Sequence, residues 1–153
     1  MADIFYNDGK RKIIDHNDTD TINLLSDTIQ VMLVNDAYVG AAGDGFVSFG
    51  AGDPAGKEIS VTGYTSGFAG TGRKTLNGKT ITVDATNAQT MFTANNVVWT
   101  ALGAGATIGA VVLYARRSSD ALSPLIAKFS VTPQATNGSD VTSQWNSNGM
   151  LTF

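Results

Sequence analysis

Residues 107–114, with the sequence TIGAVVLY, form the most continuously apolar run of the chain and are rich in β-branched side chains. The run follows Gly103 and Gly105 and is too short to span a membrane. A short apolar run next to turn residues predicts a buried central strand. A polar segment, 116–124, separates it from a second strand-like run, LIAKFSV at 125–131. We expect the two runs to pair as antiparallel strands joined by a long loop.

The composition predicts an all-β protein. The chain has 153 residues, the usual length of one domain, and only 15% of them are charged, below the typical value of about 25%. Glu58 is the only glutamate among 13 acidic residues, and aspartate favours turns over helix interiors. We therefore predict a single-domain β-sandwich or distorted barrel of antiparallel strands, with long glycine-rich loops and an N-terminal arm.

The arm is expected at residues 1–27, and a single β domain at 28–153. In the first 27 residues the apolar side chains come in short groups separated by turn residues such as those of the Asn7-Asp8-Gly9 sequence. This pattern predicts an extended arm or a first hairpin and not a helix.

The next segment, 28–34 (TIQVMLV), is the first strong strand. Alternation places its side chains on two faces, and both faces end in apolar residues. We therefore expect the second half of this strand to be covered on both sides. The first face carries Ile29, Val31 and Leu33, and the second carries Gln30, Met32 and Val34.

A hairpin is predicted from 79–85 (KTITVDA) and 89–94 (QTMFTA), with Ile81 and Val83 pointing inward. The Asn77-Gly78 sequence before it is a signal for a type I′ turn. Further on, Trp99 is expected to anchor the core. Two short strands, 141–145 and 150–153, should close the chain and pin its C-terminus into a sheet.

Possible catalytic or metal-binding motifs are weak. The glycines at 103, 105 and 109 precede a strand and no helix follows, which disfavours a nucleotide loop. Asp15, Asp18 and Asp20 lack the spacing of an EF-hand calcium loop. His16 is the only histidine, and no Gly-x-Ser-x-Gly sequence accompanies it. A pair of converging aspartates stays open as a glycosidase arrangement, but we expect no enzyme and no cofactor or metal.

Charge and cysteine content limit the partners. The net charge is −3 with only short basic clusters, which disfavours a nucleic-acid surface. The absence of cysteine excludes disulfides and thiolate metal sites. No signal peptide or membrane-length apolar run is visible, so we expect a soluble protein made in the cytoplasm, with no membrane partner.

Aromatic residues gather in glycine-rich loops, mainly in the long loop at 35–55. Three interpretations are open for them: a sugar-binding platform, anchors for a protein partner, or ordinary core residues. The aromatic residues concerned are Tyr38, Phe46, Phe49, Tyr64 and Phe68.

Several segments, in this order, resemble a family of small structural proteins of tailed bacteriophages. The glycine-rich insertion at 40–56 departs from that family, whose members have a more polar loop there. The resembling segments are IFYNDGKRKIID (4–15), SDTIQVMLVNDAY (its residues 28–33), EISVTGYTSG (58–67), LNGKTITVDATN (76–87), VVWTALGAGATIGAVVLY (97–114), SPLIAKFSV (123–131) and WNSNGMLTF (145–153).

The resemblance implies a virion component, and we expect a cement (decoration) protein on the capsid exterior. It implies binding to the major capsid protein and to copies of itself, with a trimer expected, and synthesis in the host cytoplasm. A tail or baseplate component and a carbohydrate-binding β module for cell-surface attachment stay open as alternatives. We predict that the arm and the aromatic loop contact the partner through Phe5, Tyr6, Arg11, Lys12, Tyr38, Phe46 and Phe49.

Overall fold

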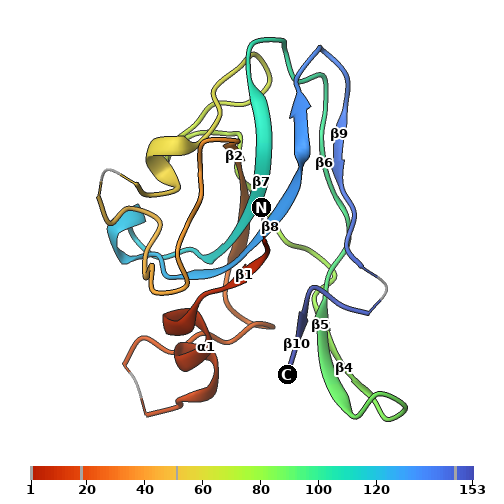
Figure 1. Cartoon of the computed structure of the whole chain (residues 1–153). Helices are drawn as coiled ribbons and strands as arrows, with labels where there is room; N and C mark the ends of the chain where they lie inside the picture. Colours follow the sequence, from red (N-terminus) through yellow and green to blue (C-terminus); the bar gives the residue numbers. More distant parts are fainter. Residues whose placement is uncertain (1, 18, 51, 147) are drawn as a thin grey trace.

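The computed structural model describes residues 2–17, 19–50, 52–146 and 148–153, and it confirms the expected all-β class. Antiparallel strands form a five-stranded sheet, a three-stranded sheet and a two-stranded ribbon (Figure 1). No helix in these ranges is long and apolar enough to cross a membrane. The five-stranded sheet has the order β1 (Ile4–Phe5), β8 (Leu125–Ala135), β7 (Thr107–Ala115), β2 (Ile29–Asn35) and β3 (Lys74–Thr75).

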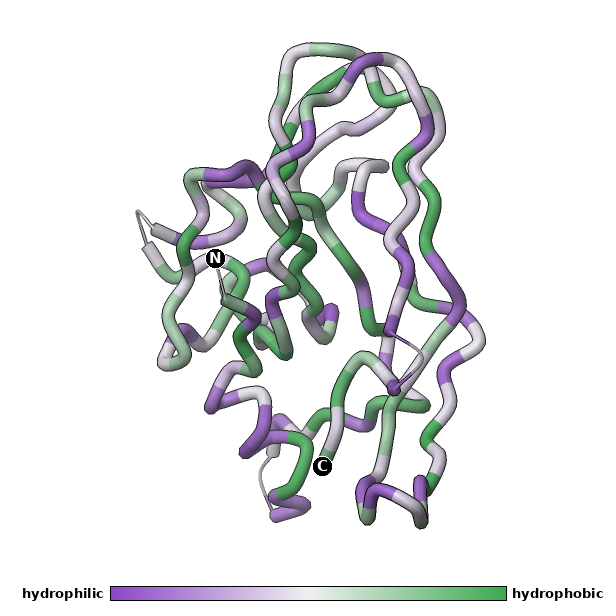
Figure 2. Tube along the Cα trace, turned by 45° about the vertical axis from the view of Figure 1, so that its right-hand side comes forward, coloured by the Kyte–Doolittle hydropathy of each residue, from purple (hydrophilic) through white to green (hydrophobic). Residues whose placement is uncertain are grey.

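The predicted central strand is β7, which lies in the middle of this sheet. It pairs antiparallel with β8 on one side and with β2 on the other, and it is buried from Ile108 to Ala115. Figure 2 shows hydrophobic residues running along these central strands. Gly109 occupies a bulge in β7, where a Cβ would overlap the backbone of Asp36. The predicted pairing of the two apolar runs is confirmed.

Strand β2 separates two hydrophobic cores, as its alternation predicts. Val31 and Leu33 pack in the larger core, whereas Met32 and Val34 pack on the opposite side of the sheet. Trp99 lies in the larger core, where its indole N–H donates to the carbonyl of Gly72 over 2.6 Å. Both predictions, the two covered faces and the Trp99 anchor, are confirmed.

A helix, and not a non-helical arm or hairpin, follows β1. Helix α1 (Asn7–Ile14) packs against β8, so the expectation for this segment is wrong. The physical reason is Gly9, which the sequence suggested was a turn residue. A Cβ at Gly9 would overlap the carbonyl oxygen of Leu125, so glycine lets the helix lie directly on the strand.

The second half of the chain forms the three-stranded sheet and the two-stranded ribbon. The β7–β8 pair continues at one end into a ribbon of β6 (Val97–Trp99) and β9 (Val141–Ser143) (Figure 1). The C-terminal strand β10 (Leu151–Thr152) pairs with β5 (Gln89–Thr93), which pairs with β4 (Thr80–Asp84). The predicted hairpin and the pinned C-terminus are confirmed. Short 3-10 turns, η1 (Ala55–Lys57) and η2 (Asp120–Leu122), lie in the loops.

The direction of Ile81 and Val83 differs from the prediction. The β4–β5 hairpin extends away from the central sheet (Figures 1 and 2), and these two side chains are 45% and 78% exposed. Gly78 has a positive φ of 62° but Asn77 does not, so no type I′ turn forms there. Strand β3 before this turn pairs with β2 and not with β4, so the segment connects two sheets.

Candidate interaction surface

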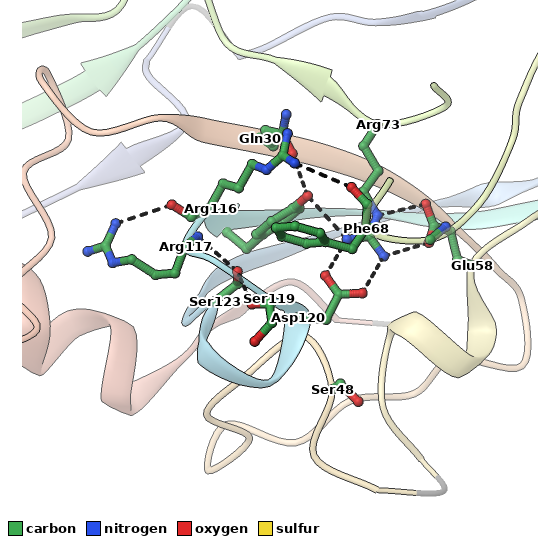
Figure 3. A network of polar contacts seen from close by, with 12 residues as sticks. Gln30, Ser48, Glu58, Phe68, Arg73, Arg116, Arg117, Ser119, Asp120 and Ser123 are labelled. Carbon is green, nitrogen blue, oxygen red and sulfur yellow. Dashed lines mark hydrogen bonds and ion pairs between the residues drawn. The ribbon is translucent and has the colours of Figure 1, made fainter. Parts of the chain in front are cut away.

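A buried network of polar side chains is centred on Arg73, which lies just before β3. Its guanidinium contacts both carboxylate oxygens of Glu58, at 3.0 and 2.8 Å, and both of Asp120, at 2.5 and 2.9 Å (Figure 3). The side chains of Arg73 and Glu58 are each 1% exposed. Three loops that are distant in sequence are therefore held together by one buried cation.

Two tyrosines complete this network. The Tyr64 hydroxyl donates to Glu58 over 2.9 Å and accepts the backbone N–H of Leu33, while the Tyr114 hydroxyl donates to Gln30 over 2.6 Å. Burial raises the pKa of the Tyr64 hydroxyl, and the neighbouring Glu58 carboxylate raises it further.

The pKa of Arg73 is also shifted by this environment. Burial alone would lower the pKa of Arg73, but its hydrogen bonds to Glu58 and Asp120 outweigh this effect, and the pKa is raised. Within the described ranges, no buried side-chain nitrogen or oxygen lacks a hydrogen-bond partner. This arrangement favours a structural clamp over a catalytic site, because its donors and acceptors are already engaged.

The predicted contact residues Tyr6 and Tyr38 lie in the smaller core. Their hydroxyl groups are 2.6 Å apart, and the two residues are 0% and 1% exposed. Burial raises the pKa of Tyr38 to about 12. Gly40 lies above both hydroxyls with a positive φ of 69°, so the glycine-rich loop closes over the pair. The structure leaves these two rings no surface to offer a partner.

The other predicted residues are partly or fully accessible, with one exception. Lys12 is buried, and its ammonium group pairs with Asp20 at 2.7 Å and lies 5.7 Å from the centre of the Phe46 ring. Arg11 is exposed and pairs with Asp8 at 2.9 Å. The helix and the glycine-rich loop are thus brought together.

Phe5 and Phe49 lie at two different places. The Phe5 ring is half-buried and packs edge-on against Phe153, with ring centres 5.6 Å apart. Phe49 is 42% exposed in the glycine-rich loop. That these two aromatic residues contact a partner stays a prediction.

The aspartate-rich segment after α1 forms ion pairs. Asp20 accepts hydrogen bonds from Lys12 and Arg117, and these lower the pKa of its carboxyl although burial acts in the opposite direction. Asp18 lies outside the described residues. Among the described residues, no group of three or more histidine, cysteine, aspartate or glutamate side chains could hold a metal ion.

Sequence reasoning missed an apolar surface that lies between α1 and the hairpin. A groove of about 320 Å³ is lined by residues of α1, of the loop after it and of β4. We call this groove, together with the exposed side chain of Val83, the hairpin surface. Alternation in β4 was a usable signal for its apolar face, but nothing in the sequence indicates that the hairpin extends beyond the body. The lining residues are Ile13, His16, Ile22, Asn23, Leu24, Leu25 and Ile81.

A second groove, of about 280 Å³, lies between the β7–β8 pair and the β6–β9 ribbon. Trp99, Ile108 and Val141 form its apolar floor, and uncharged polar side chains such as Gln134 and Gln144 line its rim. The residues that line the two grooves include no aspartate, glutamate, lysine or arginine. Comparisons of this chain with protein-family models, with curated proteins and with solved structures find no match.

Proposed function

We propose that this chain is a virion structural protein of a tailed bacteriophage, a cement protein that binds the outer surface of the major capsid shell. The resemblance of its ordered segments to that family supports the proposal. The observation that carries it is the distribution of side chains: the buried cations Lys12 and Arg73 are used in internal ion pairs, whereas large apolar side chains lie exposed. The exposed apolar residues are Ile14, Leu25, Val39, Phe49, Ile81, Val83, Val98, Leu122, Val131 and Phe153.

The proposed mechanism is non-covalent stapling. A rigid β domain contacts two or more capsid subunits and neighbouring copies of itself, and it buries apolar area across joints that the packaged DNA tends to open. At about 25 cal/mol per Å² of apolar area, even a modest contact repeated over a shell adds substantial free energy. No chemical step is needed.

The contact with the capsid is proposed for the unit formed by α1 and the glycine-rich loop. The backbone N–H of Asn7 donates to the carbonyl of Ala42 over 2.8 Å, and the Tyr6–Tyr38 pair joins the same two segments. This unit presents Arg11 and Phe49 outward and Phe46 in part, with the Phe46 ring beside the buried ammonium group of Lys12, while the buried tyrosines keep the unit in shape. The proposed partners are the major capsid protein and further copies of this chain as a trimer, located on the virion exterior.

Co-sedimentation tests this proposal. The purified chain is mixed with phage heads that have been stripped of it, and purified tails serve as the control. Saturable binding to heads, weakened in the Phe46→Ala and Phe49→Ala double variant, supports the proposal. An Ala69→Ser variant, exposed in another loop, provides the matched control. Binding to tails alone would replace the capsid role with a tail or baseplate role.

A carbohydrate-binding role has less support from this arrangement. A sugar platform needs exposed aromatic rings, but Tyr38 and Tyr64 are each 1% exposed and their hydroxyls are engaged within the core. Saturable binding of the isolated chain to a glycan array would nevertheless overturn the capsid proposal if heads and tails both failed to bind.

A further inference from the structure

We propose that the free edge of β4 pairs antiparallel with β4 of a second copy, around a two-fold axis at Thr82. This pairing would join two three-stranded sheets into one six-stranded sheet. It concerns contacts between copies of this chain and does not depend on the capsid role. Four observations lead to it: an open edge, the direction of its backbone groups, its self-complementary register and its exposed apolar face.

The edge of β4 is open and unprotected. In the three-stranded sheet the order is β10, β5 and β4, and β4 is therefore the outer strand. Its five pairs with β5, from Thr80–Thr93 to Asp84–Gln89, run without a register shift. Within Thr80–Asp84 there is no proline and no lysine. Natural edge strands usually carry a bulge, a proline or a lysine that prevents pairing with another chain.

The backbone groups of Ile81 and Val83 point to this open side. Thr90 exchanges both of its backbone hydrogen bonds with Phe153, and the carbonyl of Phe92 accepts from Met150. The N–H and C=O groups of Thr90 and Phe92 therefore face away from β4. Their cross-strand neighbours in β4 are Val83 and Ile81, which lie in non-hydrogen-bonded pairs, so the backbone groups of both face outward.

The outward groups are self-complementary in one symmetric register. An antiparallel partner centred on Thr82 places Ile81 opposite Val83 of the second copy, and the reverse pair forms by symmetry. Each pair can then exchange both backbone hydrogen bonds, and all outward groups of these two residues are used. Thr82 faces Thr82 of the second copy as a non-hydrogen-bonded pair.

The charges also favour this antiparallel arrangement. Lys79 precedes the strand and Asp84 ends it, so antiparallel pairing brings the basic end of one copy near the acidic end of the other. Parallel pairing would instead place the two Asp84 carboxylates side by side, which is destabilising. In the proposed register, Thr80 lies opposite Asp84 of the second copy.

The side chains on one face gain a partner at the same time. Ile81 shares a face with Phe92 and Leu151, both buried, but Ile81 and Val83 are themselves 45% and 78% exposed. Pairing places Val83 of the second copy beside Ile81, at the margin of the groove that Ile13 and Leu25 line. Four β-branched side chains then cover one another across the two-fold axis.

The contact is small compared with the interface of about 1,200 Å² or more that a stable complex buries. We therefore expect a weak dimer in dilute solution, which becomes populated when copies are held side by side. A covalent trap captures such a contact. The chain has no cysteine, so a single introduced cysteine is the only thiol.

The test compares Thr82→Cys with Thr80→Cys, two exposed positions on the same face of β4. In the proposed register the Cα atoms of the two Thr82 residues are about 4.5 Å apart, within the range of a disulfide. The two Thr80 residues are offset by four residues, or about 14 Å. Under mild oxidation at high protein concentration, we expect the Thr82→Cys variant to form mainly a disulfide-linked dimer. We expect the Thr80→Cys variant to stay monomeric under the same conditions.

A second variant tests whether the backbone makes the contact. The N–H of Val83 faces outward, so Val83→Pro in the Thr82→Cys background removes a donor to the second copy while keeping the bonds to β5. We expect this change to abolish the cross-link. Equal cross-linking of Thr82→Cys and Thr80→Cys would overturn the proposal, and that comparison holds even if the proline variant fails to fold.

Discussion

The buried Arg73 clamp gives the sharpest prediction about stability. Replacing Arg73 by alanine leaves Glu58 and Asp120 without their cation, and the first of these carboxylates is 1% exposed. Removing one partner of a buried ion pair costs about 3–5 kcal/mol, because the remaining charge is uncompensated. For a chain of this size, about 1 kcal/mol shifts the melting temperature by roughly 2–4 °C. We therefore expect the melting temperature of Arg73→Ala to fall by roughly 6–20 °C.

The same substitution at an exposed arginine is the matched control. The side chain of Arg11 is 50% exposed and pairs with Asp8 within helix α1. Such exposed helix pairs contribute about 0.3–0.5 kcal/mol. Thermal and urea unfolding of Arg73→Ala and Arg11→Ala, measured side by side, should thus differ by several kcal/mol. Equal losses, or a loss below about 1 kcal/mol for Arg73→Ala, would refute the clamp.

Three further predictions concern particular packing and hydrogen bonds. Gly9→Ala should lower the free energy of unfolding by about 1–3 kcal/mol, because its Cβ would overlap the carbonyl of Leu125, although alanine is the better helix former. Gly43→Ala, where a Cβ meets open space, should be neutral in the same urea titration, and equal effects would contradict the close packing of α1. Burial raises the pKa of Tyr38 above its value in the unfolded chain, so the resulting stability is present below about pH 10 and lost as the pH rises through about 12. Unfolding midpoints measured along an alkaline titration follow this loss of stability. Because Tyr38→Phe removes this ionisation, its midpoint should fall less steeply with pH than that of the wild type, and an equally steep fall would refute the contribution of Tyr38. Trp99→Phe should cost about 1–3 kcal/mol, since the buried carbonyl of Gly72 loses its donor, and calorimetry showing an unchanged melting temperature would disprove that role.

The central sheet could be predicted because its strands have strong local patterns. The apolar run of β7 and the alternation in β2 depend only on neighbouring residues, and burial on both faces leaves a clear hydrophobic signal. Trp99 could be placed in the core for a similar reason, because a large aromatic ring in a β-rich chain is usually buried.

Helix α1 could not be predicted because its stability comes from tertiary contact. Asn7, Asp8 and Gly9 are poor helix formers, and their order is typical of a turn. The helix forms because Gly9 allows close packing on β8, a contact with residues more than a hundred positions away. Local propensity contains no information about such a contact.

The Arg73 clamp and the exposed hairpin surface were also beyond sequence reasoning. Arg73 is 15 residues from Glu58 and 47 from Asp120, and no regular spacing links them. Alternation in β4 correctly placed Ile81 and Val83 on one face, but it could not show that this face extends past the body of the protein. Which strands cover a face is decided by the whole fold.

The proposed stapling role is tested most directly by the strength of the shell. Phage heads stripped of this protein are heated with and without a saturating amount of the purified chain, and release of packaged DNA is followed by dye fluorescence. The stapling mechanism predicts that added protein raises the release temperature, and that the Phe46→Ala and Phe49→Ala double variant raises it less. A release temperature unchanged by saturating wild-type protein would contradict it.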